Sequence, residues 1–193
     1  MIRLAVEADL PAILEIYRPY VENTTYTFEY DLPTMEAFTC RFQTITAKFP
    51  WLVWQEEGCV LGYAYGSTLF ERAAYGWCAE VSIYLCPEAQ GRGIGRKLYT
   101  ALEKLLFLQG YRVLQALVTE ENVGSLKFHE AMGYRTVATL PDCGMKFGRW
   151  LSVAYLEKRS EIGKIPSIMP TAFSSVVNSD RNIDKILEVL SLS

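Results

Sequence analysis

Three glycines alternate along one short stretch of the chain, between a strand-like run and a helix-like run. The stretch consists of Gln90, Gly91, Arg92, Gly93, Ile94 and Gly95. Small residues at the start of a helix let successive backbone N–H groups converge on an anion, and the positive end of the helix adds to the attraction. A loop of this kind is suited to binding a pyrophosphate.

Two other glycine-loop motifs do not fit these residues. A dinucleotide-binding GxGxxG fingerprint needs glycine at position 96, which is Arg96 in this chain. A P-loop needs the same glycine, and Leu98 stands where its hydroxyl residue belongs. The pattern Q/R-x-x-G-x-G/A does fit. An ordinary strand-to-helix turn with extra glycines is the plain alternative.

Composition narrows the class of protein. The net charge is −3, which speaks against a general nucleic-acid binder. Five cysteines without a CxxC motif, together with a single histidine, argue against a metal site or a disulfide framework. We therefore expect no metal, and reduced thiols in the cytoplasm. The first ten residues show no secretory signal, and no apolar run is long enough for a membrane span.

The periodicity of apolar residues predicts alternating strands and helices. Strands are expected at 2–5, 51–55, 59–67, 80–85, 113–118, 134–140 and 151–157, and helices at 9–21, 34–47, 93–109 and 122–132. This alternation predicts an α/β or α+β fold in one domain, residues 1–159. Residues 160–193 are expected to form a linker and a short amphipathic helix, docked on the body or on a second subunit. Its apolar residues are Ile183, Ile186, Leu187 and Leu190.

A second motif lies downstream, in the stretch ENVGSLKFHEAMGY. Its spaced residues are Asn122, Ser125, His129, Gly133 and Tyr134. With the glycine loop, residues 2–158 resemble the GNAT superfamily of N-acetyltransferases, and a mixed sheet of about six to seven strands flanked by about four helices is implied. The resemblance also implies acetyl-CoA as co-substrate, with its pantetheine arm along a splayed strand. The coenzyme residues it implies are Ile83, Tyr84, Leu85, Gln90, Gly91, Arg92, Gly93, Ile94, Gly95, Arg96, Asn122 and Ser125.

A closer resemblance is to the phosphinothricin and methionine-sulfoximine N-acetyltransferases. It rests on Arg72, Tyr75, Trp77 and Glu80 in the stretch RAAYGWCAEVSIYL, and on the loop NTTYTFEYDLP. It implies a homodimer and a substrate pocket with Phe28, Arg72 and Tyr75. Phe70 stands where some herbicide-detoxifying members carry a basic residue, which leaves Arg72 as the main anchor for a carboxylate or phosphinate.

The resemblance also assigns the chemistry of transfer. Glu80 is the expected general base, and a strand N–H near Ile83 or Tyr84 would polarise the thioester carbonyl. His129 stands where family members often carry tyrosine, and would protonate the leaving thiolate or hold an ordered water. The plain alternatives are a surface glutamate for Glu80, a core histidine for His129 and a solvated arginine for Arg72.

The resulting hypothesis is direct transfer of acetyl from acetyl-CoA to a small amino acid or analogue, of the methionine sulfone, methionine sulfoximine or phosphinothricin type. A second hypothesis is N-acetylation of peptides, protein N-termini or polyamines. A third is a non-catalytic acyl-CoA-binding sensor. Arg72 and the aromatic loop favour a small anionic amine over a basic partner.

Overall fold

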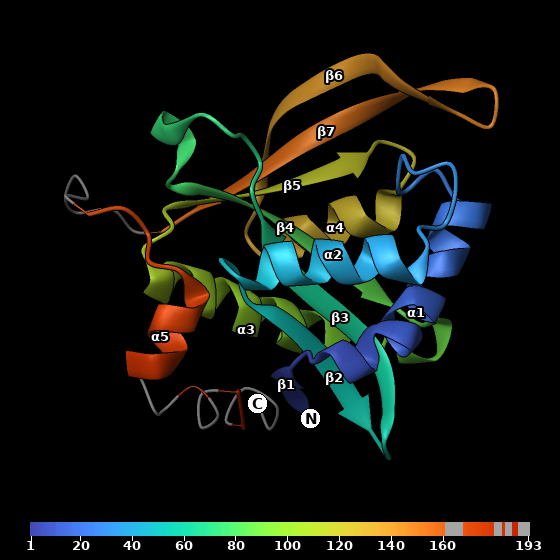
Figure 1. Ribbon diagram of the computed structural model, residues 1–193. Helices are drawn as coiled ribbons and strands as arrows, with labels where there is room; N and C mark the ends of the chain where they lie inside the picture. The colour runs from blue at the N-terminus through green and yellow to red at the C-terminus, as the bar shows by residue number, and fades with distance from the viewer. Residues whose placement is uncertain (161–167, 180–182, 184–186, 189–193) are drawn as a thin grey trace.

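A computed structural model describes residues 1–160, 168–179, 183 and 187–188. Its centre is one seven-stranded sheet, and the strand order is β1-β2-β3-β4-β5-β7-β6 (Figure 1). Neighbouring strands are antiparallel except for β4 and β5, which run parallel. The strands are β1 (Ile2–Leu4), β2 (Trp51–Glu56), β3 (Cys59–Ser67), β4 (Cys78–Leu85), β5 (Val113–Thr119), β6 (Arg135–Lys146) and β7 (Arg149–Arg159).

Helices cover both faces of the sheet (Figure 1). They are α1 (Leu10–Asn23), α2 (Met35–Thr46), α3 (Ile94–Gln109), α4 (Val123–Ala131) and α5 (Phe173–Ser179), with 3-10 turns at Glu7–Asp9, Ala73–Tyr75 and Pro87–Ala89. Alternate strand residues serve two cores, because successive side chains of a strand point to opposite faces. Leu52 packs with α3, whereas Val53 packs with α1 and α2. The predicted mixed sheet with flanking helices is thus confirmed.

The parallel pairing of β4 with β5 is short. It consists of Cys78 with Val113, Ala79 with Leu114, and Glu80 with Gln115. Beyond Glu80 both strands continue, β4 to Leu85 and β5 to Thr119, but they no longer pair with each other. The two strands therefore separate at Glu80, which matches the splayed strand that the family resemblance implied.

The described part of the C-terminal extension packs on the same chain. Phe173, Ile183 and Leu187 are buried in the core cluster that includes β2 and α3. Helix α5 lies within the stretch predicted as a linker. The Ser- and Pro-rich composition of that stretch gave no indication that Phe173 is buried. Ile186 and Leu190, also predicted to dock, lie outside the described residues.

The hairpin of β6 and β7 is joined to the end of α1 by a buried lysine. Lys146 is 1% exposed, and its Nζ donates hydrogen bonds to the carbonyl oxygens of Val21 and Thr27, both at 2.8 Å. Tyr30 adds a hydrogen bond from its hydroxyl to the Met145 carbonyl oxygen. These bonds hold the α1–α2 loop, which includes Phe28, against the hairpin.

We predict that Lys146→Met destabilises the fold by about 3 kcal/mol, because two buried carbonyl oxygens lose their charged donor. The free energy of unfolding is measured by urea titration at pH 7. Lys127→Met, at an exposed position of α4, is the matched control and should stay within about 0.5 kcal/mol of the parent protein. Equal stability of both variants would show that the Lys146 bonds do not hold the hairpin.

Candidate active site

The glycine loop opens onto the larger of two adjoining cavities, with a volume of about 540 Å³. Gly91 and Gly93 have φ angles of +72° and +78°, in the left-handed region that favours glycine. A Cβ at either position would meet no atom within 4 Å, so the bare backbone faces open space. Gly95 differs, since a Cβ there would lie 3.3 Å from Leu85 Cδ1 and would crowd the contact of α3 with β4.

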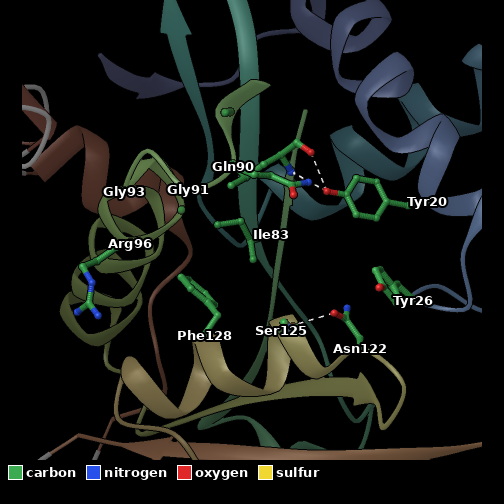
Figure 2. A pocket seen from close by; sticks show the side chains of 14 residues that line it. Tyr20, Tyr26, Ile83, Gln90, Gly91, Gly93, Arg96, Asn122, Ser125 and Phe128 are labelled. Atoms are coloured by element: carbon green, nitrogen blue, oxygen red, sulfur yellow. Dashed lines mark hydrogen bonds between the residues drawn. The ribbon is translucent and has the colours of Figure 1, made fainter. Parts of the chain in front are cut away.

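The side chains of the loop divide into those that reach the cavity and those that do not. Gln90 and Arg96 line it (Figure 2). Arg92 is exposed and forms a 2.7 Å ion pair with Glu56. The side chain of Ile94 is buried in the core, so only its backbone N–H can serve an anion. An anion in this cavity is therefore met by backbone groups of the loop and by one guanidinium.

Strand β4 presents the backbone of Ile83 to the gap between β4 and β5. The Cys86 N–H donates to the Leu61 carbonyl oxygen of β3, at 3.0 Å. Bonded pairs recur at every second residue of an antiparallel ladder, so Tyr84 also pairs with β3 and Ile83 faces away from it. The N–H and carbonyl groups of Leu85 are bonded to the hydroxyl of Tyr20, at 3.3 Å and 2.7 Å.

The gap between β4 and β5 forms a second cavity of about 70 Å³, lined from β4 by residues 81–84, from β5 by residues 116–118 and from α4 by His129. Residues shared by both cavities mark where they meet; they are Tyr20, Tyr26, Ile83, Asn122 and Ser125. Figure 2 shows Tyr20 and Tyr26 opposite the glycine loop, with Ser125 and Phe128 on α4 below. A chain bound along β4 from the loop would reach the gap at this junction.

His129 lies behind Ser125 and is 3% exposed. Its Nδ1 lies 2.8 Å from the Ser125 carbonyl oxygen, which can only accept, so Nδ1 carries the hydrogen. Its Nε2 then accepts from the Tyr99 hydroxyl at 2.8 Å. Burial lowers the pKa of His129, which favours the neutral ring.

This arrangement does not favour a direct role of His129 in protonating a leaving thiolate. Both ring nitrogens are bonded inside the protein, so neither presents a proton to the junction. The Ser125 hydroxyl, 3.2 Å from Nδ1, stands between the ring and the junction and lines both cavities. Asn122 fixes the start of α4, because its Oδ1 accepts from the Ser125 N–H at 3.1 Å.

Glu80 is the last residue of β4 that pairs with β5. Ala79 and Val81 belong to the core on the α3 side, so the Glu80 side chain points to the face of α1 and α2. It is half-buried and has no hydrogen bond or ion pair with any residue that the structure describes. Burial raises the pKa of Glu80, as a general base near neutral pH requires.

The three predicted substrate residues are exposed and line neither cavity. Phe28 lies against Gly144 of β6. Tyr75 packs on Phe70 with ring centroids 4.6 Å apart, and Arg72 forms no ion pair among the described residues. The structure thus brings most of the predicted coenzyme residues together around the two cavities, except Arg92 and the side chain of Ile94, but not these three.

Five residues that line the larger cavity escaped the sequence analysis: Tyr20, Tyr26, Ala89, Gly124 and Phe128. Tyr26 lies within the loop NTTYTFEYDLP. The polar residues around it could have indicated that its ring faces a ligand rather than the core. Tyr20 follows Tyr17 by three residues on α1, so helical spacing alone would have placed both on one face. Nothing in the sequence shows that this face reaches β4.

Comparison with known proteins agrees with this geometry. The family profile described as Acetyltransferase (GNAT) domain matches residues 2–153. The chain belongs to the GNAT family of acetyltransferases. The predicted family is therefore confirmed.

Its relatives include enzymes of the predicted subgroup. Phosphinothricin N-acetyltransferase of Streptomyces viridochromogenes is 33% identical over 165 residues, 86% of this chain and 90% of that protein. L-methionine sulfoximine/L-methionine sulfone acetyltransferase of Salmonella typhimurium is 32% identical over 157 residues, covering 81% and 92%. The crystal structure of a Sinorhizobium meliloti phosphinothricin acetyltransferase with acetyl-CoA superposes with a TM-score of 0.81 at 38% identity, covering 89% and 92%.

None of the helices in the described part of this GNAT protein is both long and apolar enough to cross a membrane. All five cysteines are free thiols.

We predict that Gly93→Ala raises the KM for acetyl-CoA about tenfold, because the added Cβ would project into the open space where a pyrophosphate is expected. Steady-state kinetics with varied acetyl-CoA measures it. Gly148→Ala is the matched control: its φ is +72°, and it lies in open space between β6 and β7. An equal KM in both variants would contradict a pyrophosphate site at the loop.

Proposed function

We propose that this GNAT enzyme transfers the acetyl group of acetyl-CoA to the amino group of a small amino acid or close analogue, of the methionine sulfone, methionine sulfoximine or phosphinothricin type. The observation that carries the proposal is the junction of the two cavities at Ile83 and Ser125, next to the point where β4 leaves β5. The named relatives act on amines of this type.

The coenzyme lies with its pyrophosphate at the glycine loop and its pantetheine arm along β4. The loop offers backbone N–H groups to the cavity, and Arg96 lines it. Arg92 reaches a phosphate only by leaving its ion pair with Glu56, so it contributes less than Arg96. The Leu85 backbone is available to the arm once the Tyr20 hydroxyl moves aside.

Glu80, at the point where β4 parts from β5, accepts a proton from the substrate ammonium, directly or through water, and the free amine attacks the thioester carbon at the junction. The N–H of Ile83 stabilises the oxyanion, because it faces the gap and has no partner on β5. When the C–S bond breaks, the nitrogen loses its second proton and the coenzyme thiolate gains one. Ser125 donates a hydrogen bond to that thiolate, while His129 and Tyr99 position its hydroxyl.

Arg72 binds the substrate carboxylate or phosphinate, and Tyr75, on the same loop, lines the side-chain pocket. The proposal is supported by the exposed guanidinium of Arg72, which has no ion-pair partner in the described part of the chain. A planar guanidinium can form two parallel hydrogen bonds with such an anion. It repels a polyamine, which makes a cationic substrate the weaker alternative.

The enzyme acts as a homodimer in the cytoplasm. Apolar side chains exposed on the β6–β7 hairpin support the dimer: Val137, Leu140, Met145, Phe147 and Trp150. The free thiols support the location. Sedimentation equilibrium of Trp150→Glu tests the dimer, since a charge in an apolar interface should raise the monomer fraction; an unchanged mass would place the interface elsewhere.

The function is tested by thiol release from acetyl-CoA against a panel of amines: methionine sulfone, methionine sulfoximine, phosphinothricin, ordinary amino acids, a polyamine and peptides. We expect the highest kcat/KM with the small anionic amines. Turnover confined to peptides or the polyamine would refute the substrate class. Coenzyme binding without turnover on any amine would indicate a sensor.

We predict that Glu80→Gln lowers kcat/KM at least about a hundredfold and removes the loss of activity at low pH that the raised pKa of Glu80 causes. The same variant should unfold at a higher temperature at pH 8, because a raised pKa in the folded state makes the charged carboxylate destabilising.

That gain in unfolding temperature should disappear below a pH of about 4, where the carboxyl is protonated in both states. Glu130→Gln, on the exposed face of α4, is the control for both measurements. Full turnover by Glu80→Gln across the pH range would exclude Glu80 as the base.

A further inference from the structure

The described start of the C-terminal extension, residues 168–173, crosses over the end of α3. The Thr171 N–H donates to the Gln109 carbonyl oxygen at 2.9 Å. The Gln109 side-chain Nε2 donates in return to the carbonyl oxygens of Thr171 and Lys48, at 2.9 Å and 2.8 Å. The Phe173 N–H donates to the Lys48 carbonyl oxygen at 3.0 Å. These bonds tie the segment to α3 and to the turn after α2.

The other end of this segment meets the loop between β3 and β4, residues 68–77. The Trp77 Nε1 donates to the Ile168 carbonyl oxygen at 3.4 Å. The Met169 side chain lies over Gly76 so closely that a Cβ on that glycine would overlap Met169 Cε. Gly76 also closes the turn Ala73–Tyr75, because its N–H donates to the Ala73 carbonyl oxygen.

Trp77 is the point where this loop joins the sheet. Its carbonyl oxygen accepts from the N–H groups of Arg112 and Val113, at 2.8 Å and 3.2 Å. The backbone of Trp77 is thus bonded to the start of β5. Its indole and the preceding Gly76 are contacted by Ile168 and Met169. Residues 70–75 are exposed, so the contacts at Gly76 and Trp77 provide much of the packing that holds this loop in place.

We propose that residues 168–173 form a strap that fixes the base of loop 68–77 and thereby positions Arg72 and Tyr75 for the amine substrate. The part concerning substrate rests on the function proposed above. Met169, Trp77 and Gln109 act as positioning residues and touch no reacting group. The strap lies beyond residue 153, where the match to the GNAT family profile ends.

Limited trypsin digestion of the full-length protein tests the strap without reference to activity, because Arg72 is an exposed cleavage site in the loop. Met169→Ala and Trp77→Phe should speed cleavage after Arg72 about fivefold, since the loop opens more often. Cleavage after Arg135, exposed on β6, is the internal reference and should not change. Met35→Ala, an exposed methionine of α2, is the matched control.

Gly76→Ala tests the same contact from the loop side. The added methyl group pushes against Met169, so this variant alone should also speed cleavage after Arg72. In the Met169→Ala background the methyl group has room, and the further effect of Gly76→Ala should be smaller. Additive effects of the two substitutions would show that Gly76 and Met169 do not act on each other.

Kinetics separates positioning from general stability. In Met169→Ala and Trp77→Phe the KM for the amine should rise about fivefold, while the KM for acetyl-CoA and the kcat stay near the parent values. Unchanged cleavage after Arg72, or equal acceleration at Arg72 and Arg135, would overturn the strap. If the parent protein acetylates no amine, the proposed function fails, and the digestion still decides whether the strap holds the loop.

Discussion

The early end of the β4–β5 pairing is the constraint on which the site depends. After Glu80 the two strands separate, and the backbone of Ile83 has no strand partner on that side. An unbonded N–H inside a protein costs about 1–3 kcal/mol, so the gap favours a ligand that can accept its hydrogen. The Tyr20 hydroxyl already bonds the Leu85 backbone, and this leaves Ile83 as the innermost free position.

Near the gap between β4 and β5, the pKa values of Glu80 and His129 are shifted in opposite directions. Burial favours the neutral form of each, so it raises the pKa of Glu80 and lowers that of His129. Glu80 lies where the strands part and keeps an unbonded carboxylate, which suits proton exchange. His129 lies deeper, and its bonds to Ser125 and Tyr99 fix its tautomer. Depth and bonding thus separate a residue that exchanges protons from one that positions a neighbour.

The sequence predicted those parts of the structure that depend on residues close together in the chain. The glycine loop, the cap at Asn122 and the alternation of strands and helices depend on residues close in sequence, and each was found. Tyr20 could not be assigned to the site, because its contact is with Leu85, 65 residues away. The burial of Lys146 depends likewise on carbonyl groups more than a hundred residues distant.

The coenzyme side and the amine side are built differently. The coenzyme cavity is formed by β4, α3 and α4, whose opposite faces are buried in the main core through residues such as Leu98 and Leu102. Phe28, Arg72 and Tyr75, the proposed substrate residues, are instead exposed and lie on loops. If these residues bind the amine as proposed, a change in those loops can alter the amine accepted while the larger cavity stays intact. Relatives of this chain are named for phosphinothricin and for methionine sulfoximine. Under the proposed function, the contacts that hold these loops would set the substrate preference of this chain more than the lining of the larger cavity does.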